Sequence, residues 1–175
     1  PLAMILGEAG KIDEALKLLD EYNDMGDQHS SVVTVRADVL ALAGRASEGL
    51  KEIEALIDEK PSDISLLNAS CWYRARFRVG VESMIDVCNE AVEKGSNAAA
   101  VLDSRAMAGI ASGDLTAALN DVEEALRLAP QQVQTQFLRA WIANAMGKPE
   151  GKADLAYFRK AMPGFVQEYA RYGLK

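Results

Sequence analysis

The sequence contains little of what metal and redox centres are built from. One histidine, His29, and two cysteines, Cys71 and Cys88, stand among 175 residues. A single histidine cannot supply the histidine pairs of a zinc site, and two cysteines cannot form a four-ligand cluster. We therefore expect no metal and no other cofactor.

Positive charge and long apolar runs are also scarce. Lysine and arginine number 19 against 26 aspartates and glutamates, and the net charge is −7. Surfaces that bind nucleic acid concentrate lysine and arginine, so we expect no nucleic-acid partner. No apolar run approaches the roughly 18 residues of a membrane helix, and no secretory signal opens the chain. The start at Pro1 leaves room for upstream sequence, and the compartment stays open between periplasm and cytoplasm.

Motifs for catalysis are missing as well. His29 lies beside Ser30 and Ser31, but a nucleophile and its base must meet in space with a third, orienting group. We expect His29 to be a surface or linker residue. The acidic residues fall mostly on polar helix faces, and the sequence contains no phosphate loop, nucleophile elbow or metal-binding helix. We therefore do not expect this chain to be an enzyme.

What is abundant is alanine. The chain has 28 alanines against 13 glycines and 5 prolines, and 49% of its residues are apolar. Alanine has the highest helix propensity, and clusters of β-branched residues that would favour strands are few. This composition predicts an all-helical protein.

Glycines recur at a nearly constant spacing, which indicates an internal repeat. The glycines concerned are Gly10, Gly44, Gly80, Gly113 and Gly147. Each is separated from the next by about 34 residues, a period typical of stacked helical hairpins. Two prolines, Pro61 and Pro130, lie about two such periods apart.

Two segments show the repeating unit most clearly. They are VRADVLALAGRASEGLKEIEALIDEKP (35–61) and SRAMAGIASGDLTAALNDVEEALRLAP (104–130), and LRAWIANAMGK (138–148) repeats their opening. In each long segment an apolar stretch precedes the glycine, another follows it, and proline ends the unit. We predict a helix, a tight turn at the glycine with a left-handed backbone, and a second antiparallel helix. Asp114 is the expected N-cap of one such second helix.

The unit resembles the tetratricopeptide repeat, which consists of two antiparallel helices in about 34 residues. The best match is 99–132, and its matching residues are Leu102, Ala106, Gly113, Ala118, Val122, Ala125 and Pro130. In 30–63, Gly49 and Leu56 replace expected alanines, and 64–98 has one extra residue near Val79 and Gly80.

The resemblance implies a right-handed α-solenoid of about five helix-turn-helix repeats with a C-terminal capping helix. It divides the chain into a partial repeat (1–29), three repeats (30–63, 64–98 and 99–132), a degenerate repeat (133–163) and the capping helix (164–175). We expect the capping helix to cover the apolar face of the last repeat, as an open solenoid requires.

A narrower resemblance links LLNASCWYRA, GKADLAYFRKA and FVQEYARYG to C-terminal repeat arrays of certain proteobacterial proteins. Some of those proteins carry an upstream transglutaminase-like domain. This resemblance implies an alternative role as the accessory region of a larger envelope enzyme, with the chemistry in another part of that enzyme.

The two cysteines are placed symmetrically about a turn. Cys71 lies in the first predicted helix of its repeat and Cys88 in the second, with the turn near Val79 and Gly80 midway between them. Residues equidistant from the turn of a helical hairpin face each other. Two interpretations stay open, a disulfide formed in an oxidising compartment or two buried thiols that pack as small apolar groups.

In tetratricopeptide arrays the first helices line an inner groove, and the resemblance places one set of residues there. This set is Thr34, Asp38, Asn68, Trp72, Arg76, Asp103, Met107, Ile110, Phe137, Trp141 and Asn144. Relatives that clasp C-terminal carboxylates use lysine, asparagine and arginine at such positions, so this set argues against a carboxylate clamp. A phase error of one residue would place Trp72 and Trp141 in the core instead.

The sequence therefore predicts a protein-interaction scaffold that binds a peptide or protein in a concave groove. Tryptophan, methionine and phenylalanine flanked by acids suit an apolar or basic partner. A further alternative is a structural module that self-associates through the incomplete N-terminal repeat, whose apolar face lacks most of a covering helix.

Overall fold

The computed structural model describes residues 2–24, 30–95 and 98–175, and these form helices joined by turns with no strand among them. The helices are α1 (Leu2–Glu8), α2 (Ile12–Asp24), α3 (Ser30–Leu42), α4 (Ala46–Glu59), α5 (Ile64–Phe77), α6 (Met84–Lys94), α7 (Ala99–Ser112), α8 (Leu115–Leu128), α9 (Val133–Ala145), α10 (Pro149–Ala161) and α11 (Pro163–Arg171). His29 lies outside the described residues. No helix within them is long and apolar enough to span a membrane.

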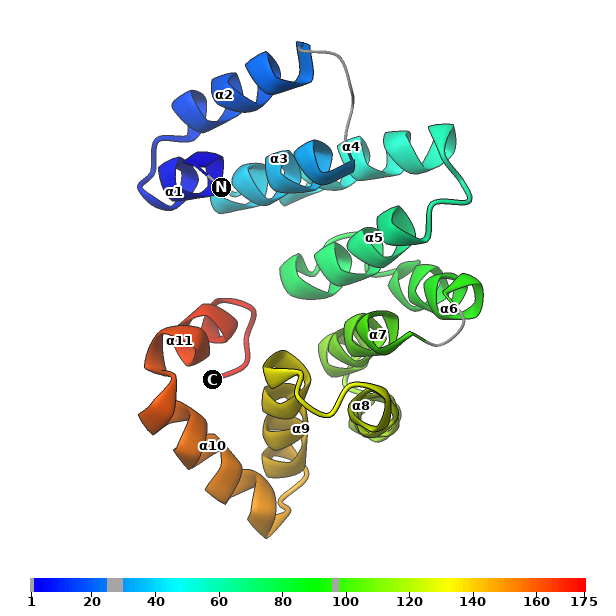
Figure 1. Cartoon of the computed structure of the whole chain (residues 1–175), viewed down its shortest axis with the longest axis vertical. Helices are drawn as coiled ribbons and strands as arrows, with labels where there is room; N and C mark the ends of the chain where they lie inside the picture. The colour runs from blue at the N-terminus through cyan, green and yellow to red at the C-terminus, as the bar shows by residue number, and fades with distance from the viewer. Residues whose placement is uncertain (1, 25–29, 96–97) are drawn as a thin grey trace.

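Successive helices pair as antiparallel hairpins from α1 and α2 to α9 and α10. The first helices of neighbouring hairpins also pack on one another, α3 on α5, α5 on α7 and α7 on α9. The hairpins follow a curved path on which α6 and α8 lie outside α5 and α7 (Figure 1). The prediction of an α-solenoid built from helical hairpins is confirmed, and α11 lies on the inside of the curve.

The turns confirm the role predicted for the repeated glycines. All five have positive φ angles, which are 77° at Gly10, 75° at Gly44, 56° at Gly80, 89° at Gly113 and 76° at Gly147. A side chain at such an angle would clash with the backbone, so glycine allows the chain to reverse within a few residues. After Gly113, the Asp114 carboxylate accepts a hydrogen bond from the Ala117 N–H at 3.0 Å, which makes it the N-cap of α8 as predicted.

The longest turn of a helical hairpin joins α5 to α6, where the sequence predicted one extra residue. Here Arg78 and Gly80 both take positive φ angles, and α6 begins only at Met84. The Arg74 guanidinium fills the space inside this turn, because its Nη1 donates to Gly80 O at 2.8 Å and to Ser83 Oγ at 3.0 Å. A buried arginine therefore holds the extended turn in shape.

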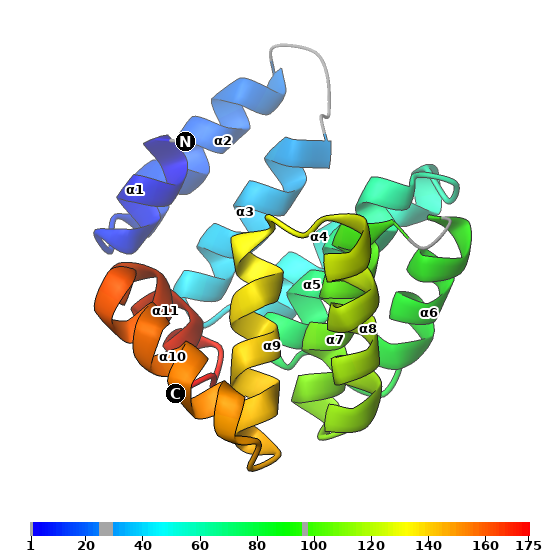
Figure 2. The ribbon, with the colours of Figure 1, turned by 60° about the horizontal axis from the view of Figure 1, so that its bottom comes forward.

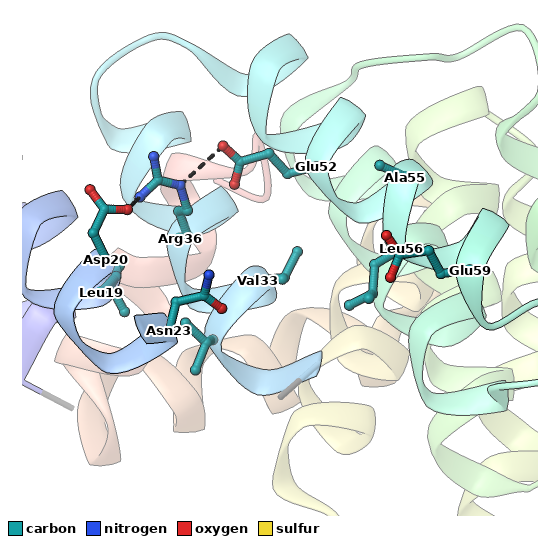
Figure 3. Close-up of a pocket in the computed structure, with 10 residues that line it drawn as sticks. Leu19, Asp20, Asn23, Val33, Arg36, Glu52, Ala55, Leu56 and Glu59 are labelled. Atoms are coloured by element: carbon teal, nitrogen blue, oxygen red, sulfur yellow. Dashed lines mark hydrogen bonds and ion pairs between the residues drawn. The ribbon is translucent and has the colours of Figure 1, made fainter. Parts of the chain in front are cut away.

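Arginines on the first helices also tie neighbouring second helices together. Arg36 on α3 contacts Asp20 of α2 at 2.5 Å and Glu52 of α4 at 3.0 Å, so one guanidinium bridges two hairpins (Figure 3). Arg105 on α7 repeats this arrangement, with Asn89 of α6 at 3.1 Å and Asp121 of α8 at 2.7 Å. Each bridge joins residues 16 positions before and after the arginine. These bridges fix the register of the stacked hairpins.

The two cysteines form a covalent link inside one hairpin. Cys71 of α5 and Cys88 of α6 are joined in a disulfide with their Cα atoms 4.9 Å apart, and both side chains are fully buried. The two helices approach each other closely enough at this level for the two sulfur atoms to bond. The bond ties together the hairpin that carries the longest turn.

Replacing both cysteines, as Cys71→Ala with Cys88→Ala, should lower the free energy of unfolding by about 2 kcal/mol, since the crosslink restricts a loop of 17 residues in the unfolded chain. Urea titration of both proteins measures this difference. Thiol labelling of the denatured, unreduced wild type should find neither cysteine reactive. Two labelled thiols in protein purified under oxidising conditions would show that the bond does not form.

Candidate functional site

The inner face of the solenoid has an open part between α3 and α5. A pocket of about 320 Å³ lies there. It is lined by Thr34, Asp38, Ile53, Ser65, Asn68, Ala69, Trp72, Tyr73 and Arg76. Five of these residues were predicted to line the groove. They are Thr34 and Asp38 of α3, and Asn68, Trp72 and Arg76 of α5. The structure therefore brings together the N-terminal half of the predicted set.

The start of α5 determines which side chains reach this pocket. Asp63 is its N-cap, and the carboxylate accepts hydrogen bonds from the Ser65 N–H at 2.9 Å and the Leu66 N–H at 3.3 Å. From that start, Asn68, Trp72 and Arg76 follow at intervals of four residues and share one face of the helix.

Arg76 is the most heavily contacted residue of the pocket. Its guanidinium forms an ion pair with Asp38 of α3. Its guanidinium carbon also lies 5.5 Å from the ring centre of Trp72, 4.8 Å from that of Phe77 and 5.2 Å from that of Tyr172. Burial raises the pKa of Asp38, and the Arg76 charge opposes this rise. The ion pair and the rings hold Arg76 in one position at the back of the pocket.

Two polar atoms at this pocket are buried with no partner among the described residues. They are the Asn68 side-chain oxygen and the Arg76 Nε. An unpaired buried polar atom costs about 1–3 kcal/mol, and native proteins satisfy most such atoms with protein, water or ligand. Asn68 and Arg76 both line the pocket, and Trp72 is only half-buried beside them. The pocket therefore combines an amide, a guanidinium and an aromatic ring.

The middle part of the predicted groove is closed to solvent. Asp103, Met107 and Phe137 are each 1% exposed, and Ile110 is also buried. The Phe137 ring centre lies 5.0 Å from that of Tyr169 of α11. These residues do line the inside of the curve, but contrary to expectation α11 covers them, so a partner cannot reach them in this state.

The two predicted groove residues at the far end of α9 lie outside the open pocket. Trp141 is half-buried and packs against the main core, in keeping with the alternative that placed it there. Asn144 is exposed. The expected continuous groove is therefore divided into an open pocket at α3 and α5 and a wall that the tail occupies.

The tail, residues 163–175, reaches further than the sequence indicated. Its Phe165 packs against Phe137 of α9 and Phe158 of α10, as expected of a helix that covers the last repeat. Tyr172 also reaches back to α5, where its hydroxyl lies 3.3 Å from Arg76 Nη1. Helix periodicity identifies an apolar face but not the surface that it contacts, so no sequence signal named Arg76 as the partner.

Asp103 is an acidic residue inside this closed region. Its Oδ2 accepts a hydrogen bond from the Gln134 side chain, and its Oδ1 has no partner in the described part of the chain. Burial raises its pKa above the ordinary 3.8, and the Thr135 hydroxyl and the Gln134 side chain beside it oppose only part of this rise. The folded protein therefore retains a proton at pH values where the unfolded chain has released it.

Asp103→Asn should consequently stabilise the protein at neutral pH by about 1 kcal/mol, because it removes a buried charge and keeps an acceptor for Gln134. The wild type should lose this stability as the pH rises from the unfolded pKa of Asp103 through the raised folded pKa. The advantage of the variant should vanish below pH 3.8, where both residues are neutral. Urea denaturation between acidic and neutral pH tests this. A constant difference across the range would contradict it.

An apolar hollow lies at the other end of the solenoid, among α1, α2 and α3. Its volume is about 420 Å³. Leu2, Ala3, Leu18, Leu19, Tyr22, Ser31, Val32 and Val35 line it. The helix α1 has 7 residues, whereas the first helices of the next two hairpins have 13 and 14.

In the described ranges, no cluster of histidine, cysteine and acidic residues is arranged to hold a metal ion.

Solved structures with similar folds are tetratricopeptide-repeat proteins. A thermophilic TPR protein of Thermus thermophilus matches with a TM-score of 0.72 and 18% identity, over 98% of this chain and 94% of that one. A tetratricopeptide repeat protein from Parabacteroides merdae matches with a TM-score of 0.70 and 16% identity, over 91% of this chain and 62% of that one.

MamA from Desulfovibrio magneticus matches with a TM-score of 0.61 and 14% identity, over 93% of this chain and 90% of the other. No protein-family model and no curated protein matches the sequence. The likeness therefore rests on the path of the backbone, together with the turn glycines and the paired helices. The chain has the fold of the tetratricopeptide-repeat solenoids.

Proposed function

We propose that the protein is an interaction scaffold that binds a peptide or protein partner at the pocket between α3 and α5, and that it carries out no covalent chemistry. The observation that carries this proposal is the open pocket, in which the polar side chains of Asn68 and Arg76 lie beside the half-buried Trp72. A peptide group can hydrogen-bond to the polar side chains of the lining while an apolar side chain rests on Trp72.

The charge of the protein indicates which partners are favoured. The net charge of −7 attracts a cationic partner and speeds its approach at low ionic strength. Asp38 is already paired with Arg76, so the pocket itself is close to neutral. We therefore expect affinity from apolar and hydrogen-bonding contacts in the pocket, and steering from the net negative charge of the protein.

A peptide display library screened on the full chain tests this function. Binders should lose about tenfold in affinity on Asn68→Ala, the loss typical of one hydrogen bond to a neutral group. Asn144→Ala is the matched control, because this exposed asparagine lies outside the pocket. A library without binders, or binders equally affected by the two substitutions, would contradict the proposal.

The N-terminal hollow supports self-association as a second candidate function. Leu2, Ile5 and Tyr22 are 59%, 64% and 63% exposed, so this end presents several large apolar side chains to solvent. Two copies that bury the same apolar edge against each other would form a symmetric dimer. Light scattering over a range of concentrations should show association, and Ile5→Glu should abolish it. A monomer at all concentrations would remove this candidate.

A further inference from the structure

The C-terminal segment lies inside the curve of the solenoid, between α9 and α10 on one side and α1 on the other (Figures 1 and 2). Two of its side chains are almost fully enclosed there, Tyr169 at 2% exposure and Leu174 at 1%. Both belong to the main core cluster together with Met107 and Phe137 of the inner wall. The segment therefore covers the inner wall of the solenoid.

The contacts of this segment reach well beyond the last repeat. The Tyr169 ring centre lies 6.4 Å from that of Trp72, and the Tyr172 ring centre lies 5.8 Å from that of Phe77. At the far side, Arg171 Nη1 lies 3.4 Å from Glu8 Oε1 of α1. A cap that only covered the last repeat would not need contacts with α5 and α1.

The joint before this segment is short and separates it from α10. Met162 is the one residue between the two helices, with φ −139° and ψ 56°. Pro163 then begins α11, and a Cβ built on Gly164 would meet no described atom within 4 Å. The direction of the tail is thus set at a single residue between the two helices, and there is open space around Gly164 at the start of α11.

We propose that the tail is a ligand held in cis, and that the wall formed by α5, α7 and α9 is a receptor for an amphipathic helix with aromatic residues at positions i, i+4 and i+7. In the tail these positions are Phe165, Tyr169 and Tyr172. A partner helix with this pattern binds by displacing the tail, which matches the spacing of anchors seen when a helix lies in a groove. The inference goes beyond the proposed function, since this wall is a second surface beside the pocket between α3 and α5.

A tail that must be displaced lowers the apparent affinity of the wall for a partner. The apparent affinity equals the affinity of the free wall multiplied by the fraction of molecules in which the wall is free. If the tail is open in about 1% of molecules, weakening it can increase the apparent affinity about 100-fold at most. The tail would then compete with every partner for the wall, and only a partner with a matching aromatic face would displace it.

The test uses the full chain and a fluorescent peptide of residues 163–175 as the probe. The chain is compared with its Tyr169→Ala, Leu174→Ala form, which weakens the tail and leaves the wall intact. The probe should bind this form at least about tenfold more tightly than the wild type. A probe that itself carries Tyr169→Ala and Tyr172→Ala is the matched control and should not bind. Hydrogen exchange must show α11 opened with α3 to α9 still protected.

A locked chain completes the test. Glu8→Cys and Arg171→Cys, joined by a short bismaleimide, tether the tail to α1, while the buried Cys71 and Cys88 stay unlabelled. The locked chain should not bind the probe. Equal binding by locked and opened chains, or failure of the probe to bind an opened chain, would overturn the inference. Library peptides that still bind the locked chain through Asn68 would leave the proposed function standing.

Discussion

Phe137→Ala should lower the free energy of unfolding by about 3–5 kcal/mol, the usual cost of deleting a fully buried aromatic ring. The Phe137 ring centre lies 5.4 Å from that of Phe158, 5.5 Å from that of Phe165 and 5.0 Å from that of Tyr169. Its removal leaves a cavity at the point where α9, α10 and α11 meet. Thermal unfolding followed by circular dichroism should show a fall of about 10 °C.

Tyr157→Ala is the control for this prediction. Tyr157 is also an aromatic residue of this region, with its ring centre 5.9 Å from that of Phe158, but it is 67% exposed. Its replacement should change the free energy of unfolding by no more than about 0.5 kcal/mol. Similar losses for the two variants would show that burial in this ring cluster is not what stabilises the C-terminal end.

Gly49→Ala should destabilise the protein by about 3 kcal/mol, although helix propensity alone predicts a gain of about 1 kcal/mol. A Cβ at this position would lie 2.3 Å from the Tyr73 hydroxyl, 2.8 Å from Ala37 Cα and 2.9 Å from Ala37 O. The Tyr73 hydroxyl is shared between two carbonyl oxygens, Ala37 O at 2.9 Å and Ala46 O at 3.1 Å. An alanine would displace this hydroxyl and push α3 and α4 apart. Urea denaturation measures the loss.

A double-mutant cycle with Tyr73→Phe separates the clash with the Tyr73 hydroxyl from the clash with the backbone of Ala37. Removing the hydroxyl makes room for the new methyl group, so the two substitutions together should cost about 1 kcal/mol less than the sum of each alone. Gly164→Ala, in α11, is the control for alanine in a helix, because a Cβ there would meet no described atom within 4 Å. Strict additivity, or a stabilising Gly49→Ala, would contradict the assigned role of Tyr73.

Gly49 also shows what a repeat pattern can and cannot predict about a single position. The pattern of the resembling family places alanine at this position, and the glycine was recognisable as a departure from it. Its reason lies in the next hairpin, where the Tyr73 hydroxyl of α5 reaches back to the turn region of the hairpin that contains Gly49. A local pattern reports that a position is unusual, but the contact that makes it so depends on how neighbouring hairpins stack.

The candidate site was predictable in part for a related reason. Asn68, Trp72 and Arg76 lie on one face of α5 because the helix repeats every 3.6 residues, and this phase follows from the sequence. The resemblance to tetratricopeptide arrays placed Asp103 and Phe137 on the inner face, which is where they lie. Whether a residue on that face is exposed to solvent depends on a second segment, the tail, which covers Asp103 and Phe137 but leaves the pocket between α3 and α5 open.

The sequence by itself determined the unit and its order. Regularly spaced glycines allow the chain to reverse, and alanines let the two helices of each unit approach, so these local features require no knowledge of distant contacts. The tertiary structure alone decided where the segment from Pro163 onward would pack. Aromatic side chains such as Tyr169 and Tyr172 can cover any apolar surface of suitable shape, since hydrophobic contact is not directional. Only the curvature of the stacked repeats brings α5 and α1 within their reach.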